Sequence, residues 1–189
     1  MVRVYGSAPP HRRRLSRHNE RVKPSRSARR APATPALQVL HLADIAHVVH
    51  EFAHDPSSAL PYGLEAAEAL GADPARVFKT LVTVVDEALV VAIVPVTARL
   101  DLKALAATVH GRRASLADAA LAERATGYVT GGISPFGQRR RLRTVIDEHA
   151  LDHETIWVSA GRRGLEVEIA TTAVIAVTEA ISARLTRES

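Results

Sequence analysis

The chain has 189 residues, a formal net charge of +5 and no cysteine. This length suits one domain with a core of its own, and the lack of cysteine excludes a disulfide framework, a cysteine nucleophile and a thiolate metal site. No apolar run is long enough to span a membrane, and none follows the basic N-terminus early enough to act as a secretory signal. We therefore expect a cytoplasmic protein with no membrane partner.

The first 33 residues differ from the rest in charge. They hold ten Lys and Arg against one acid, so the remaining residues carry 15 bases against 19 acids. This segment has no hydrophobic period and cannot bury enough apolar surface to offset its ordering entropy. We expect residues 1–33 to be a disordered basic extension and residues 34–189 to form the domain. The extension is a solvated segment, the product of a start codon assigned too far upstream, or a tether for nucleic acid.

The domain is expected to open with a helix, a strand and a second helix. Thr34 is the predicted N-cap of the first helix, which continues to His41. Residues 48–53 are predicted to form a strand. Residues 60–70 have the period of an amphipathic helix, and Gly71 is suited to end it in the left-handed conformation.

A pair of apolar segments gives the clearest structural signal. Residues 80–85 and 89–94 are dense in Val, Leu and Ile and are separated by three residues, which predicts a buried β-hairpin. The later elements are predicted as helices 101–109 and 118–124, strands 128–130, 144–147, 155–159 and 165–169, and a final helix 171–180. This mixed order predicts an α/β or α+β domain with a mixed sheet, and it excludes a doubly wound Rossmann pattern.

Two segments have the composition of a binding or catalytic site. Lys79 lies between Phe78 and an apolar strand, where we expect its stem to be embedded. The loop 131–137, Gly-Gly-Ile-Ser-Pro-Phe-Gly, exposes backbone N–H groups that no side chain shields. Together they suit a polarised carbonyl or a phosphate. The structural alternatives are a surface lysine and a tight turn that needs glycine for its geometry alone.

Seven ordered blocks, which include these two segments, closely resemble the YbaK/EbsC family of free-standing aminoacyl-tRNA deacylases, related to the editing domain of bacterial prolyl-tRNA synthetases. The blocks cover most of the chain from Thr34 onward and are residues 34–37, 54–56, 78–81, 100–103, 126–128, 131–137 and 158–165. The resemblance implies a mixed, barrel-like β-sheet flanked by helices, with no cofactor and no metal. It also implies mischarged tRNA(Pro) as a partner, with prolyl-tRNA synthetase beside it.

The same resemblance implies roles for individual residues. Lys79 matches the lysine most closely tied to activity, and Gly131 is expected to line the pocket as the second catalytic residue. The residues expected to bind substrate are Phe52, Thr80, Gly132, Ser134 and Ser159. Phe52 stands where many relatives carry tyrosine, so a hydrogen bond made there by relatives is missing. Ser134 is not expected to be a nucleophile, because it does not lie in a Gly-x-Ser-x-Gly elbow.

A cluster of four arginines follows the glycine loop directly. It consists of Arg139, Arg140, Arg141 and Arg143. A run of charges is usually a solvated face, but next to this loop it is predicted to bind the phosphates of a tRNA acceptor stem.

Three histidines close in sequence invite a metal hypothesis. They are His47, His50 and His54. A zinc site needs three or four convergent ligands, and no clear further partner stands elsewhere in the sequence. We therefore expect no metal site.

The sequence shows no Ser-His-Asp or Cys-His arrangement and no paired carboxylates. An activated aminoacyl ester can be cleaved by positioning and carbonyl polarisation alone. The first hypothesis is a trans-editing deacylase for Cys-tRNA(Pro), in which, as the resemblance implies, the substrate thiol attacks the ester. The second is a hydrolase for Ala-tRNA(Pro) or another small aminoacyl-tRNA. The third is a non-catalytic tRNA-binding partner of a synthetase.

Overall fold

The computed structural model describes residues 3–5, 34–55 and 57–187. The helices are α1 (Pro35–Leu42), α2 (Tyr62–Leu70), α3 (Leu102–Thr108), α4 (Ala119–Thr126) and α5 (Thr171–Thr178), with the 3-10 turns η1 (Pro74–Arg76) and η2 (Glu148–Asp152). The strands are β1 (Arg3–Tyr5), β2 (His47–Glu51), β3 (Phe78–Val85), β4 (Ala88–Pro95), β5 (Arg99–Leu100), β6 (Ala114–Leu116), β7 (Arg143–Asp147), β8 (Thr155–Arg162), β9 (Leu165–Ala170), β10 (Ile181–Ala183) and β11 (Thr186–Arg187). Within the described ranges, no helix is long and apolar enough to cross a membrane.

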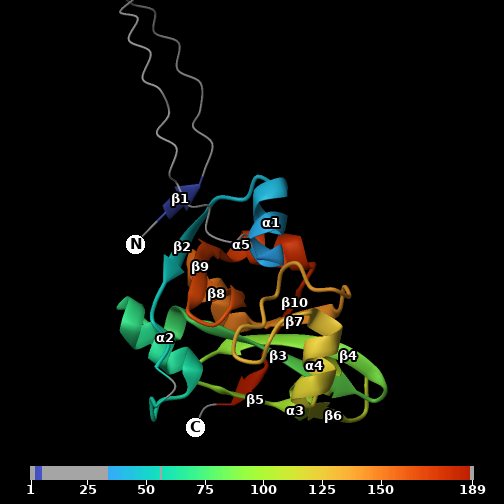
Figure 1. The fold of residues 1–189 in the computed structure, drawn as a ribbon. Coiled ribbons are helices and arrows are strands. Elements are labelled where there is room, and N and C mark those ends of the chain that lie inside the picture. Colours follow the sequence, from blue (N-terminus) through green and yellow to red (C-terminus); the bar gives the residue numbers. More distant parts are fainter. Residues whose placement is uncertain (1–2, 6–33, 56, 188–189) are drawn as a thin grey trace, which may run out of the picture.

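The described strands form three sheets (Figure 1). The order β1-β2-β9-β8 is antiparallel throughout, whereas the order β10-β7-β4-β3-β6 combines parallel and antiparallel pairs. Strands β5 and β11 form a small third sheet. The predicted mixed α+β architecture is confirmed. The barrel-like sheet that the resemblance implies is not formed, because the described strands divide into separate sheets and do not close on themselves.

The hairpin and the helix caps agree with the predictions. Strands β3 and β4 pair from Phe78 opposite Pro95 to Val85 opposite Ala88. Thr34 caps α1, since its hydroxyl accepts a hydrogen bond from the Leu37 N–H at 3.3 Å. Helix α2 ends at a glycine with φ of +63°.

Other elements differ from the predictions. Residues 128–130 form no strand, because the chain turns there and the Gly132 N–H bonds to the Val129 carbonyl at 2.9 Å. The last helix ends at Thr178, and the short strands β10 and β11 follow it. Residues 3–5 pair with β2, so this part of the basic extension has regular structure, while residues 6–33 lie outside the described residues.

The core is mainly aliphatic and holds the site in place. Figure 1 shows β8 and β9 above β3 and β4, with α4 in front of the five-stranded sheet. Side chains of α4, β3, β4, β8 and β9 share one buried cluster, in which Phe78 and Phe136 are the largest fully buried side chains. A bridge between Val77 and Trp157 joins the start of β3 to β8. The packing therefore fixes β3 against β8, and the cavity described below lies between them.

The C-terminal strands depend on one buried carboxylate. Asp147 is fully buried at the end of β7, and its carboxylate accepts hydrogen bonds from the Leu185 N–H at 2.8 Å and the Thr186 hydroxyl at 3.1 Å. The backbone N–H and Nδ1 of His149 lie 3.1 and 2.6 Å from its other oxygen. This carboxylate thus ties the end of the chain to the five-stranded sheet.

Replacing Asp147 by Ala should lower the free energy of unfolding by about 3 kcal/mol, because buried donors lose a charged acceptor. Urea unfolding would measure the change. Asp152→Ala, at an exposed position in η2, is the matched control and should change stability by less than about 0.5 kcal/mol. Equal stabilities of the two variants would show that the C-terminal strands do not depend on Asp147.

Candidate functional site

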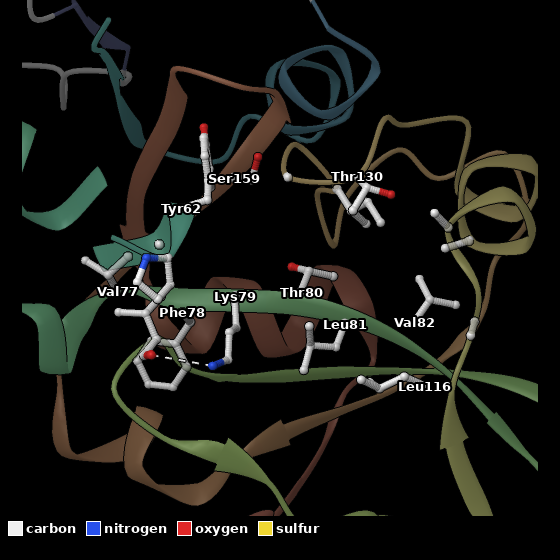
Figure 2. Close-up of a pocket in the computed structure, with 18 of the residues that line it drawn as sticks. Tyr62, Val77, Phe78, Lys79, Thr80, Leu81, Val82, Leu116, Thr130 and Ser159 are labelled. Carbon is white, nitrogen blue, oxygen red and sulfur yellow. Dashed lines mark hydrogen bonds between the residues drawn. The ribbon is translucent and has the colours of Figure 1, made fainter. Parts of the chain in front are cut away.

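A cavity of about 490 Å³ lies between β3, the β8–β9 pair, α4 and the loop after α4. Its wall consists of Pro61, Tyr62, Gly63, Val77, Phe78, Lys79, Thr80, Leu81, Val82, Val96, Leu116, Ala117, Ala119, Ala122, Thr130, Gly131, Ile133, Ser159 and Glu166. Most of these side chains are apolar, so the few polar groups in the wall face little competing water. Figure 2 shows the wall around β3.

Lys79 lies in this wall, but its ammonium group is held outside the centre. Its Nζ donates to the carbonyl of Ala98 at 2.7 Å and lies 3.4 Å from the carbonyl of Val96. Burial lowers the pKa of Lys79 from its ordinary value, and the nearby charge of Arg99 lowers it further. Figure 2 shows the Lys79 side chain extending away from Ser159.

Thr80 leaves β3 on the other side, as neighbouring residues of a strand do. Figure 2 shows its hydroxyl on the side where Ser159 and Thr130 lie. The Thr80 hydroxyl is buried and has no hydrogen-bond partner in the described part of the chain. The hydroxyl of Ser159 is also buried, and only the distant N–H of Gly161 approaches it, at 3.5 Å. Both hydroxyl groups can therefore bond to a ligand.

The glycine loop contributes one of its predicted residues to the wall. Gly131 lines the cavity and has φ of +88°, a conformation that favours glycine. Gly132 does not line it, and a Cβ at this position would come within 2.8 Å of the backbone of Arg162 and Arg163. Ser134 does not line it either: it is fully buried, and its hydroxyl accepts the Phe136 N–H at 3.3 Å.

Phe52 also lies outside the wall. Its ring packs on the ring of Tyr62 with centroids 5.9 Å apart, and Tyr62 is the residue that lines the cavity. The Tyr62 hydroxyl accepts the N–H of Gly164 at 2.6 Å, and burial raises the pKa of Tyr62 to about 12. Phe52 thus supports the cavity wall indirectly, by packing on Tyr62.

The four predicted arginines are exposed and lie outside the wall. Arg141 forms an ion pair with Glu179, and Arg143 donates to the carbonyl of Val109 at 3.1 Å. Side chains of Arg139 and Arg140 have no ion pair with a described residue. The cluster is therefore separate from the cavity.

Glu166 is a wall residue that the sequence did not indicate as functional. It is 4% exposed, pairs across the sheet with Ser159, and has no hydrogen-bond donor among the described residues. Desolvation raises its pKa to about 8, so the carboxyl group is largely neutral at pH 7. The sequence offered no signal for it, because Glu166 and Glu168 alternate with apolar residues, which is the pattern of a strand with one face in solvent.

The three histidines do not converge. His47 bonds to the carbonyl of Ile45 at 2.7 Å, His50 packs on Trp157 with ring centroids 4.1 Å apart, and His54 lies 2.9 Å from a carboxylate oxygen of Glu65. Within the described ranges, no group of three His, Cys, Asp or Glu side chains could hold a metal ion.

Comparison with known proteins identifies relatives of this chain. A family profile described as an aminoacyl-tRNA editing domain matches residues 63–176. EbsC of Enterococcus faecalis, whose name proposes a Cys-tRNA(Pro)/Cys-tRNA(Cys) deacylase, is 39% identical over 121 residues, which are 64% of this chain and 74% of EbsC.

Solved structures share the fold. A proposed trans-editing enzyme for prolyl-tRNA synthetase superposes with a TM-score of 0.71 at 26% identity, covering 84% of this chain and 99% of the other. The hypothetical protein APE2540 has a TM-score of 0.73 at 19% identity, covering 82% and 100%, and shows the fold alone. The matched profile and the identity to EbsC together establish that this chain belongs to the aminoacyl-tRNA editing domain family.

Proposed function

We propose that this protein removes cysteine from mischarged Cys-tRNA(Pro) in trans, in the cytoplasm and beside prolyl-tRNA synthetase. The name of the E. faecalis relative extends the proposal to Cys-tRNA(Cys). The observation that carries it is a cavity of about 490 Å³ in whose wall Gly131 lies together with the buried carboxyl group of Glu166 and a buried Thr80 hydroxyl that bonds to no described residue. These groups suit a small polar ligand such as an aminoacyl ester.

The ester carbonyl is best placed at Gly131. This residue has no side chain to block its backbone, and its N–H has no acceptor among the described residues. A fixed N–H donor stabilises the negative charge that develops on a carbonyl oxygen as it is attacked.

Lys79 supplies positive charge to the same reaction. Its ammonium rests on the carbonyls of Val96 and Ala98, and four rotatable bonds allow it to turn toward an oxyanion or a terminal phosphate when a substrate enters. Its partly desolvated environment strengthens the attraction for such an anion.

The amino acid moiety fits the Thr80 side of the cavity. Thr80 and Ser159 offer hydroxyl groups there, and Glu166 stands opposite Ser159 in the sheet. An α-ammonium group beside Glu166 would favour loss of the carboxyl proton and form a buried ion pair. These three residues and Gly131 are thus the proposed substrate contacts of the wall.

The bond-breaking step uses the substrate's own thiol. The cysteine sulfur attacks the ester carbonyl carbon, a C–S bond forms and the C–O bond to the ribose breaks. The thiol proton passes to the ribose oxygen, which leaves as the free hydroxyl of the tRNA, and the cysteine leaves as a cyclic thiolactone. Such a step needs positioning and carbonyl polarisation, and no nucleophile from the protein.

Lys79→Ala should lower the rate of cysteine release from Cys-tRNA(Pro) by about 100-fold or more, the usual cost of losing a group that stabilises an oxyanion. Release of labelled cysteine would measure it. Lys103→Ala, which removes an exposed lysine from α3, is the matched control and should keep the wild-type rate. Full activity of Lys79→Ala would remove Lys79 from the mechanism.

The same assay separates thiol attack from attack by water. 2-Aminobutyrate has a methyl group in place of the thiol. If sulfur is the nucleophile, the ester that joins 2-aminobutyrate to the tRNA should be stable. Rapid release of 2-aminobutyrate or alanine would assign the protein to hydrolysis of small aminoacyl esters. Turnover of none of these substrates would refute a deacylase and leave a tRNA-binding module.

The exposed arginines are the proposed contact for acceptor-stem phosphates. The double variant Arg139→Ala/Arg140→Ala should raise KM and leave kcat unchanged, because phosphate contacts bind ground and transition states alike. The slope of log affinity against log salt should fall by about 1 to 2. Arg112→Ala/Arg113→Ala, another exposed pair, is the control. Equal effects of both double variants would indicate a general charge effect with no defined contact.

Glu166 should make stability depend on pH. The unfolded chain loses this proton near pH 4.5, but the folded protein keeps it until about pH 8, so the unfolded state binds fewer protons between these values. Stability should therefore fall as pH rises from 4.5 to 8. Glu166→Gln should remove this fall and be more stable than wild type by up to about 5 kcal/mol at pH 9. Glu68→Gln, on the exposed surface of α2, is the control. If the free energy of unfolding depends on pH equally in wild type and in Glu166→Gln, the neutral form of Glu166 is contradicted.

A further inference from the structure

Residues 129–132 form a tight β-turn beside the cavity. The Gly132 N–H closes it by bonding to the Val129 carbonyl at 2.9 Å. The third residue, Gly131, has φ of +88°, whereas Thr130 has no positive φ. A turn with these angles is of type II, which requires glycine or a similarly permissive residue at the third position.

The central peptide of this turn joins Thr130 to Gly131. The described chain has no cis peptide bond, and a trans peptide directs its carbonyl and its N–H to opposite sides. The direction of the Thr130 carbonyl therefore fixes the direction of the Gly131 N–H. A type I turn has this same peptide plane reversed, and glycine permits both forms.

Arg163, in the turn between β8 and β9, holds this peptide by its carbonyl. Its Nε and Nη2 lie 3.0 and 2.7 Å from the carbonyl oxygen of Thr130. The guanidinium also covers Gly131, since a Cβ at that position would come within 2.8 Å of Nε. The carbonyl is thus fixed toward Arg163, and the Gly131 N–H points away from it.

A second residue holds the turn from α4. An oxygen of Glu123 accepts the Thr130 N–H at 2.9 Å and lies 3.1 Å from the Thr130 hydroxyl. Both polar backbone groups of Thr130 are therefore occupied, while the N–H of Gly131 has no acceptor within the described ranges. The Gly131 N–H is therefore available as a hydrogen-bond donor. Gly131 is also the residue whose backbone contacts the ester carbonyl in the proposed reaction.

We infer that Arg163 is a positioning residue, which holds the central peptide in the type II orientation and so keeps the Gly131 N–H available to the substrate's carbonyl oxygen. The inference rests on the proposed deacylation, because that reaction gives the N–H its task. Without Arg163 the reversed peptide competes, and the fraction of protein with a correctly directed donor falls.

Kinetics of Arg163→Ala and Arg162→Ala test this inference. Arg162 lies in the same turn, pairs with Glu51 at 3.1 Å and carries the same charge, so it is the matched control. Arg163→Ala should lower kcat for cysteine release by about tenfold with KM changed less than about twofold, while Arg162→Ala should leave both unchanged. Arg163→Lys should recover part of the lost kcat, because an ammonium can donate to the same carbonyl.

A structural measurement separates this inference from the proposed function. In a type II turn the Thr130 Hα lies close to the Gly131 amide proton, and in a type I turn this proximity is lost. The corresponding nuclear Overhauser effect should be strong in wild type and in Arg162→Ala and weak in Arg163→Ala. This measurement tests the role of Arg163 in the turn even if the wild-type protein releases no cysteine. Failure of the wild-type protein to release cysteine would refute the proposed function alone.

Two results would overturn the inference. An Overhauser pattern unchanged by Arg163→Ala would show that the turn keeps its form without the guanidinium. A higher KM with unchanged kcat, a lower salt dependence and full recovery by Arg163→Lys would instead assign Arg163 to a phosphate of the tRNA.

Discussion

The close approach of the β8–β9 turn to the glycine loop is the contact on which the site depends. Side chains at Gly131 or Gly132 would come within 2.8 Å of atoms in residues 162–163, so both positions exclude a Cβ unless the turn moves. The turn belongs to the four-stranded sheet, and the loop follows α4 and packs on the five-stranded sheet. This contact brings the β8–β9 side of the cavity wall against the glycine loop.

Burial in this wall makes the charged form of both titratable groups less favourable. The pKa of Glu166 rises to about 8 and that of Lys79 falls, in both cases mainly through desolvation. The Thr80 hydroxyl bonds to no residue in the described part of the chain. Each of these groups costs stability in the folded protein, and each can be satisfied by a ligand. The cavity therefore stores unfavourable free energy that a substrate with complementary groups can release.

The sequence predicted some parts of this arrangement and missed others for identifiable reasons. The β3–β4 hairpin was clear because Val, Leu and Ile fill both strands, whereas β10 and β11 are too short to leave a period. Lys79, Thr80, Gly131 and Ser159 do lie in one wall. Gly132 does not, because sequence alone cannot show which side of a loop faces a cavity. Glu166 was not predicted, because a carboxylate in a strand is expected to be solvent-exposed until its neighbours are known.

The positions of the donors explain how such a site can do without a catalytic base. Lys79 and Thr80 are adjacent in sequence but leave β3 on opposite sides, so only the Thr80 hydroxyl faces Ser159 (Figure 2). The Lys79 ammonium group donates to two backbone carbonyl oxygens, which are weaker acceptors than an anion would be. In the proposed reaction, an ester that develops negative charge at Gly131 competes for this ammonium more strongly as the charge grows. The interaction then favours the transition state over the bound substrate, which is the condition for catalysis by electrostatics alone.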